Sequence, residues 1–387
     1  MFKKTLVFSL AIVWLLVGVC TIASAAQNVG NTSQKGSVLI FPKIDTTTDD
    51  NNTRDTIIQI SNDYPRGVMV KCYWVDSDQT IQDFMFLITI TQPVWFRASD
   101  GLGTASYNND VSTQPMTVPP FFSNSVGELK CWAVNFEGTS EINWNHLYGT
   151  ATVLDYHNMT AYEYNSFNFT ARGFADLGQE TGPGGDIVLS GANLAYDACP
   201  QYLMFNFFSY APTKDVAVDG EGQMVRFNKT DLTLVPCKQD LRQDRIPTCT
   251  KAKFDIWNEN ETKYTGAYQC FKCWFEGYLN EIGTTLDPNG KASGIGGAKF
   301  TYEGLHTMMG RMRVTGVAST VCNNIFATCK GQVNSPLLGI TSTQIFFNGG
   351  LAKSELTAAT GVGAGVGEAS HILWDPSGLP PEVPAKR

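Results

Sequence analysis

The two cysteines in the stretch YQCFKCWF, residues 268–275, could serve more kinds of chemistry than any other residues of this sequence. Cys270 and Cys273 have the C-x-x-C spacing that serves zinc binding, disulfide exchange, haem attachment or the cross-linking of a fold. Covalent haem attachment requires a histidine directly after the second cysteine, and Trp274 occupies that place. A thioredoxin-like redox site requires a strand that leads into a helix, whereas this stretch has no helical pattern. Zinc and structural disulfides are the remaining alternatives.

Zinc would need further ligands, which the pair Cys322 and Cys329 could supply. The six residues between these two cysteines are an unusual spacing for a zinc site, and exported chains usually oxidise such thiols. Side chains of a β-strand alternate between two faces, so Cys270 and Cys273 would point in opposite directions. We therefore expect structural disulfides in which each of these two cysteines bonds to a different partner.

The N-terminus has the pattern of a secretory signal peptide. Lys3 and Lys4 precede an apolar run, and Ala23 and Ala25 have the A-x-A spacing of a cleavage site after Ala25. The apolar run is shorter than the ~20 residues that a bilayer span requires, and no later segment is long and apolar enough. We therefore expect residues 26–387 to be secreted to the extracellular space or the outer cell surface of a bacterium, with the periplasm as an alternative.

Nine cysteines follow the cleavage site, which in an oxidising compartment predicts up to four disulfides and one cysteine left over. Cys72 and Cys131 each lie in the middle of an expected strand, so a bridge between them would join two strands or two sheets. Cys322 and Cys329 would close a short local loop. The disulfide candidates are Cys72, Cys131, Cys199, Cys237, Cys249, Cys270, Cys273, Cys322 and Cys329.

Stretches with a period of two residues, rich in aromatic and β-branched side chains, recur along the chain between Gly, Pro, Asn and Asp. In GVMVKCYWV, for example, Val68, Val70 and Trp74 share one face of an expected strand. Sustained helical periodicity is absent before residue 190. The pattern predicts an all-β fold of two antiparallel, immunoglobulin-like β-sandwich domains with structural disulfides and a flexible C-terminal tail.

A glycine-rich break in the middle of the chain predicts the boundary between the two domains. The expected organisation is a signal peptide at 1–25, an N-terminal β-sandwich domain at 26–177, a Gly-rich linker at 178–193, a C-terminal β-rich domain at 194–349 and a flexible tail at 350–387.

No catalytic or cofactor-binding motif occurs in the sequence. The four histidines are far apart and lack metalloprotease spacing, and neither a G-x-S-x-G elbow nor a phosphate-binding glycine loop is present. Acidic stretches at 45–50 and 76–83 offer carboxylates for calcium but lack the spacing of an EF-hand. We predict no catalytic residues, no cofactor and no metal, although carboxylates that meet only in space are not visible in a sequence.

Charge and aromatic content bear on the binding partners. Without the two lysines of the signal peptide, 26 basic residues face 36 acidic ones, a formal balance of −10, and no basic cluster occurs along the sequence. Nucleic acid and anionic membranes are therefore disfavoured as partners. Trp144 lies in the polar stretch EINWNHLYG, where an exposed indole would stack on a sugar ring or a protein partner.

Four fragments, TIIQISNDYP, TITQPVWFRASDGLG, VGELKCWAVN and TDLTLVPC, carry a resemblance to a known group. In patches over residues 36–280 the chain resembles uncharacterised exported β-rich proteins of environmental Gram-negative bacteria. In that group a strand-rich N-terminal half ends in a QPxxWxASxGL-like segment, and here Phe96 and Arg97 stand between the tryptophan and the alanine. The resemblance implies export and a strand-rich fold, but it gives no indication of an activity.

The function predicted from these observations is that of a secreted, non-enzymatic structural or adhesive protein of the cell surface or the extracellular space. Its partners would be other surface proteins, further copies of itself, or polysaccharide. A carbohydrate-binding or polysaccharide-active protein is one alternative. A self-assembling subunit of an extracellular filament is the other, because a terminal segment or an exposed strand edge can dock into a neighbouring molecule.

Overall fold

The computed structural model describes thirteen parts of the chain, and all structural statements below concern these parts. They are residues 29–49, 52–105, 118–157, 160–181, 187–211, 216–217, 224–237, 249–283, 296–317, 322, 336–347, 352–355 and 369–373. The expected signal peptide at 1–25 lies outside the described residues.

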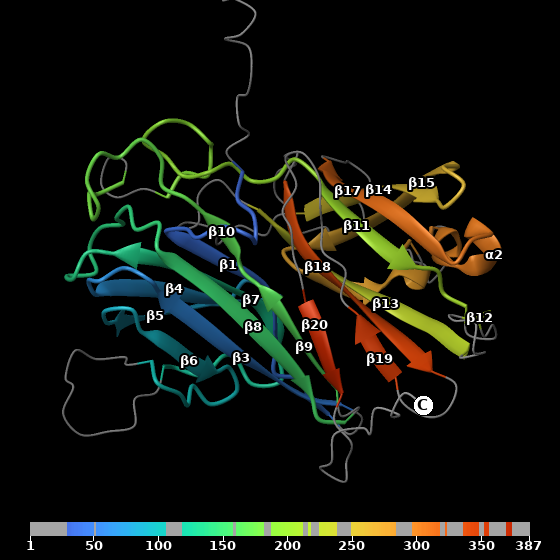
Figure 1. The fold of residues 1–387 in the computed structure, drawn as a ribbon, viewed down its shortest axis with the longest axis horizontal. Coiled ribbons are helices and arrows are strands. Elements are labelled where there is room, and N and C mark those ends of the chain that lie inside the picture. Colours follow the sequence, from blue (N-terminus) through green and yellow to red (C-terminus); the bar gives the residue numbers. More distant parts are fainter. Residues whose placement is uncertain are drawn as a thin grey trace, which may run out of the picture.

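The described chain is built almost entirely from β-strands, which confirms the predicted all-β class (Figure 1). The first half contains β1 (Val38–Asp45), β2 (Thr48–Asp49), β3 (Asn52–Asn62), β4 (Val68–Asp76), β5 (Ile81–Ile88), β6 (Pro93–Arg97), β7 (Val126–Val134), β8 (Leu147–Asp155), β9 (Thr160–Asn165) and β10 (Phe167–Phe169).

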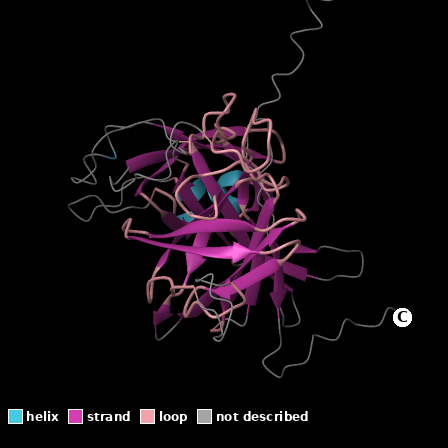
Figure 2. Ribbon diagram, turned by 90° about the vertical axis from the view of Figure 1, so that its left-hand side faces the viewer, coloured by secondary structure: helices cyan, strands magenta, loops and turns pink. Residues whose placement is uncertain are grey.

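The second half continues with strands and three short helical turns, which lie among the layered strands in Figure 2. Its strands are β11 (Leu203–Phe208), β12 (Val216–Ala217), β13 (Met224–Pro236), β14 (Cys249–Asn258), β15 (Lys263–Lys272), β16 (Phe275–Tyr278), β17 (Met309–Val317), β18 (Leu337–Phe347), β19 (Ala352–Glu355) and β20 (Ala369–Leu373). The turns are η1 (Leu279–Glu281), η2 (Gly297–Phe300) and α2 (Tyr302–Leu305).

The strands form three antiparallel sheets. A five-stranded sheet has the order β10-β1-β7-β4-β5, and a four-stranded sheet has the order β11-β17-β14-β15. An eleven-stranded sheet has the order β12-β13-β18-β19-β20-β9-β8-β3-β2, with β16 paired to β13 and β6 paired to β3. This last sheet contains strands from both halves of the chain.

The five-stranded sheet separates two hydrophobic cores. One face contributes Leu39, Val70 and Trp74 to a core that is completed by β3, β6, β8 and β9, which makes the first half sandwich-like. The other face contributes Val38 and Trp132 to a core that also holds the inner faces of β11, β13, β14 and β17. The period of two that placed Val70 and Trp74 on one face is therefore confirmed, and the opposite face of that sheet is buried as well.

The second core is shared by both halves of the chain, which differs from the expectation of two domains joined by a linker. Ile187 and Leu189, within the expected Gly-rich linker at 178–193, are buried in this core. Ile187 and Leu189 are thus part of the shared core.

Part of the expected flexible tail also joins the fold. Within 350–387 the structure describes β19 and β20, which lie between β18 and β9 (Figure 1). β20 pairs with β9 over five residue pairs, whereas a single pair, Glu355 with Ser370, joins it to β19. This strand links the N-terminal and C-terminal portions of the eleven-stranded sheet.

Three disulfides cross-link the described residues. Cys72 and Cys131 lie directly opposite each other on β4 and β7, so the predicted bridge between these strands is confirmed. The other two bonds join Cys199 to Cys237 and Cys270 to Cys322.

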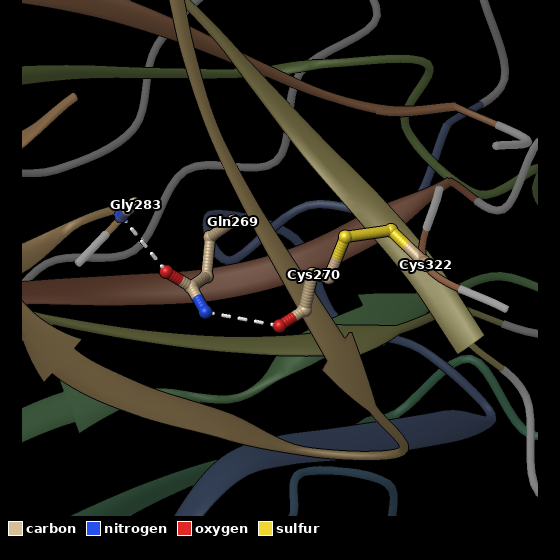
Figure 3. The surroundings of a disulfide bond; sticks show 4 residues. All are labelled: Gln269, Cys270, Gly283 and Cys322. Carbon is tan, nitrogen blue, oxygen red and sulfur yellow. Dashed lines mark hydrogen bonds between the residues drawn. A yellow bond between two sulfur atoms is a disulfide. The ribbon is translucent and has the colours of Figure 1, made fainter. Parts of the chain in front are cut away.

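The Cys270–Cys322 bond corrects one predicted pairing and supports another (Figure 3). The expected local loop between Cys322 and Cys329 is wrong, because Cys322 bonds to β15 instead. Cys270 does bond to a partner other than Cys273, as predicted. Gln269 beside it donates from Nε2 to the Cys270 carbonyl at 2.9 Å and accepts from the Gly283 amide at 3.1 Å. Cys329 and the side chain of Cys249 lie outside the described part of the chain.

The C-x-x-C stretch forms a corner between two sheets and not one continuous strand. β15 ends at Lys272, and buried Cys273 has a backbone φ of 62°, in the left-handed region. The chain then enters β16, which belongs to the eleven-stranded sheet. The prediction that Cys270 and Cys273 lie on one strand is therefore wrong, because β15 ends at Lys272 and Cys273 itself forms the turn.

Replacing Cys72 and Cys131 together by valine should lower the free energy of unfolding by about 4 kcal/mol. The bond closes a loop with a sequence separation of 59 residues, and valine places no polar atom at either buried position. Urea unfolding followed by tryptophan fluorescence measures the difference. An unchanged unfolding midpoint in the double variant would show that this bond does not support the fold.

Candidate functional site

The strongest concentration of buried charge lies where β1 meets the second half of the chain. Lys43 and Asp45 are two residues apart on β1 and therefore share a face of the strand. All eight residues of β1 are buried, so these charges require partners inside the protein. We call Lys43, Asp45, Arg54, Asp155, Asp231 and Glu276 the charge clamp.

The backbone of β1 is irregular at this point. Its pairing with β7 shifts register between Phe41 and Ile44, and side chains replace the missing ladder bonds. The Lys43 amide donates to the hydroxyl of Tyr164 at 3.0 Å, and that hydroxyl donates in turn to the Lys43 carbonyl. Trp274 Nε1, from the corner before β16, donates to the Pro42 carbonyl at 2.9 Å. The bulge thus aims Lys43 at the second half of the chain.

Lys43 is the centre of the clamp. Its side chain is 3% exposed, and Nζ lies 3.0 Å from Oδ2 of Asp231 on β13 and contacts Oε1 of Glu276 on β16. The Tyr162 ring centroid lies 5.6 Å from the same nitrogen. Burial acts to lower the pKa of Lys43, but the charges of Asp231 and Glu276 outweigh it and hold the pKa well above its usual range. The ammonium is therefore retained.

Arg54 on β3 extends the clamp across the first half of the chain. Its Nη1 lies 3.1 Å from Oδ2 of Asp45, and its Nε lies 3.2 Å from Oδ2 of Asp155 on β8. The same Nη1 is 3.8 Å from Oε1 of Glu276. Two cations and four carboxyl groups from five strands therefore form one connected network.

The clamp holds more acidic than basic groups, and Glu276 adjusts the balance. Four ionised carboxylates against Lys43 and Arg54 would leave a net charge of −2 in a buried place. Burial, followed by the charge of neighbouring Asp231, raises the pKa of Glu276 to about 7. Glu276 thus binds a proton much more readily than an exposed glutamate does, which lowers the excess of negative charge.

The clamp is an internal ion-pair network in which two carboxyl groups contact one ammonium. A glycosidase keeps its two carboxyl groups about 5 to 10 Å apart with the substrate between them. Asp231 and Glu276 are instead both directed at one buried ammonium. The six groups connect β1, β3 and β8 of the first half with β13 and β16 of the second.

Trp144, the predicted stacking residue, does not form an exposed surface. Its side chain is 4% exposed, its Nε1 donates to Oδ1 of Asn62 at 3.0 Å, and the edge of its ring meets Tyr64. This prediction is wrong, because buried Asn62 satisfies the indole inside the core although the neighbouring sequence is polar.

Two carboxylates from the acidic stretches considered for calcium, those of Asp45 and Asp76, make contacts within the fold. Asp45 is fully buried against Arg54. Oδ1 of Asp76 accepts from the amides of Asp78 and Thr80, which closes the turn between β4 and β5. Among the residues that the structure describes, no group of three or more His, Cys, Asp and Glu side chains is placed to hold a metal ion.

The sequence contains one signal for the charge clamp. In VLIFPKID, a lysine and an aspartate follow an apolar run at a spacing of two, within what proves to be a buried strand. Charged residues are almost never fully buried unless they are paired. No such signal identifies their partners at positions 231 and 276, which lie far away in the sequence.

Comparison with other proteins identifies no relative of this chain. The chain matches no protein-family model and no curated protein. The resemblance to exported β-rich proteins therefore stays a prediction. Within the described ranges, no helix has the length and hydrophobicity of a membrane-spanning segment.

Replacing Glu276 by glutamine should reduce the pH dependence of stability. A pKa of about 7 in place of the ordinary 4.5 means that ionising Glu276 costs the folded state about 3 kcal/mol. The folded protein binds this proton more tightly than the unfolded chain, so the wild type should lose stability as the pH rises from 5 to 8. The variant cannot ionise there and should lose less in urea unfolding.

The matched control is Glu259→Gln, in the exposed turn after β14. This variant should keep the wild-type dependence of unfolding free energy on pH. Equal slopes for the wild type and Glu276→Gln between pH 5 and 8 would contradict the assignment of the bound proton to Glu276.

Proposed function

We propose that this protein is a secreted, non-enzymatic structural or adhesive component of the cell surface or the extracellular space. The observation that carries the proposal is the way in which both halves are fastened together. A shared core and the charge clamp join the two halves, and the three disulfides cross-link each half within itself. Such a body resists partial unfolding outside the cell, where no folding machinery acts on it.

Two further observations support the extracellular setting. Disulfides form and persist in oxidising compartments, and three of them cross-link the described residues. The N-terminal sequence has the composition of an export signal with a cleavage site after Ala25.

Expression of the full chain with a C-terminal tag in a Gram-negative bacterium tests the proposal. We expect a mature protein that begins at Ala26, carries oxidised cysteines and is reached by antibody on intact cells or in the medium. As a control, Ala23→Leu with Ala25→Leu should prevent cleavage, because both cleavage-site positions need small residues. Retention in the cytoplasm with reduced cysteines, or turnover of a panel of glycosides, esters and peptides, would contradict the proposal.

Self-assembly is a second candidate, because one observation favours it. β20 covers the edge of β9 over five residue pairs but is joined to β19 by one pair. The thirteen residues 356–368 between β19 and β20 include four glycines and can span roughly 45 Å when extended. The β20 strand of a neighbouring copy could therefore occupy the same edge, as in strand-addition complexes.

Removal of residues 369–387 should distinguish assembly through this strand from an isolated protein. In size-exclusion chromatography under non-reducing conditions, we expect the full mature chain to form dimers or larger species as its concentration rises. The truncated chain should stay monomeric and should bind a synthetic peptide of residues 366–376 at the vacated edge. A full chain that remains monomeric at all concentrations would argue against assembly.

A further inference from the structure

The outer face of the four-stranded sheet gathers positive charge from three strands. Alternation along β14 turns Ala252, Phe254 and Ile256 inward and Lys253 and Trp257 outward. Pairing with the neighbouring strands places outward-facing basic residues beside them. We call Lys251, Lys253, Lys263, Arg311 and Arg313, together with Asp255 between them, the basic face.

The basic face differs in charge from the rest of the molecule. Five cations and one carboxylate give it a formal charge of +4, whereas the whole chain has a formal charge of −8. Glu259 and Glu261 lie in the turn at one end of the face and do not divide it. The sequence shows no basic cluster because these residues come from positions 251–253, 263 and 311–313, which only the sheet brings together.

Much of this charge is accessible. The side chains of Lys253, Lys263 and Arg313 are 50%, 45% and 39% exposed, and Arg311 is exposed as well. Exposed cations of this kind attract anions over about 10 Å at moderate ionic strength.

Asp255 shows how the basic face contacts a carboxylate. Its nearly buried carboxylate lies 2.5 Å from Nη2 of Arg313, 3.5 Å from Nζ of Lys263 and 3.8 Å from Nζ of Lys253. Burial acts to raise the pKa of Asp255, but the hydrogen bond from Arg313 and the surrounding positive charges outweigh it and lower the pKa. Three cations thus share one carboxylate, which leaves positive charge for anions from outside.

Aromatic rings are interleaved with the cations. Nζ of Lys251 lies 4.2 Å from the centroid of Tyr268, and Nζ of Lys263 lies 5.3 Å from that of Trp257. The guanidinium carbon of Arg313 lies 5.9 Å from Trp257 and equally far from Tyr202. The outer face of the sheet thereby has aromatic rings beside charged groups. Sugar rings stack on such aromatic surfaces, while their acidic substituents pair with Lys and Arg.

We propose that the basic face binds an acidic polysaccharide, whose carboxylate or sulfate groups pair with the cations while its sugar rings lie against Trp257 and Tyr268. This inference rests on the proposed extracellular function, for which it supplies the adhesive partner. The proposed extracellular setting favours a polysaccharide over nucleic acid as the polyanion, and the experiment compares the two at the same salt concentration.

Affinity electrophoresis of the oxidised mature chain in gels with polygalacturonate, dextran sulfate or neutral dextran tests the inference. We expect retardation by at least one acidic polymer and none by dextran, and retardation should weaken as salt is added. The double variant Lys253→Gln with Arg311→Gln should bind about five- to tenfold more weakly, because it loses two exposed charge contacts.

The matched control is the double variant Lys35→Gln with Arg66→Gln, which removes one exposed lysine and one exposed arginine from the first half of the chain. It should bind as the wild type does. Thermal unfolding of each variant establishes that the fold is intact.

Three outcomes would overturn the inference. These are no retardation by either acidic polymer at low salt, an equal loss of binding in the control variant, and tighter binding to DNA than to both polysaccharides at the same salt concentration. None of them would affect the test of export and surface exposure, so the basic face can fail while the proposed function stands.

Discussion

The fold depends on the complete burial of β1. A strand that is covered on both faces is normally apolar throughout, because an unpaired charge in such a place is strongly destabilising. β1 nevertheless carries Lys43 and Asp45, and its pairing with β7 is interrupted beside them. Each charge and each backbone group freed by the bulge must therefore find a partner. These partners come from β3, β9, β13, β16 and the corner before β16, which ties the arrangement of the second half to the first.

The need to pair the buried charges of β1 limits how the two halves of the chain can meet. A purely hydrophobic contact tolerates sliding, since apolar packing has little directional preference. A buried ammonium shared by Asp231 and Glu276 does not tolerate it, because removing either contact leaves charge without compensation. The clamp therefore fixes the registry of the halves, while the shared core supplies most of the favourable free energy. Burial, followed by the neighbouring charge of Asp231, raises the pKa of Glu276 in the clamp to about 7.

The sequence predicted what depends on local periodicity. The all-β class and the shared face of Val70 and Trp74 follow from alternation along single strands, and the Cys72–Cys131 bridge was predicted because both cysteines lie in the middle of expected strands. Features that depend on distant positions were not predictable. The corner at Cys273 needs a left-handed backbone at a residue other than glycine, for which no composition rule gives notice. The basic face is assembled from separate strands. The indole of buried Trp144 donates a hydrogen bond to the side chain of Asn62, which lies 82 positions away in the sequence.

The order of the three disulfides along the chain affects how far the molecule can extend when its ends are pulled. The three bonds close loops 72–131, 199–237 and 270–322, which follow one another without overlap. A pull on the two ends of the chain cannot extend the residues inside a closed loop, because the force passes through the sulfur atoms instead. Each loop therefore keeps its length even when the strands within it separate. The residues inside the three loops therefore add no length when the chain is stretched, and only the segments outside them can extend.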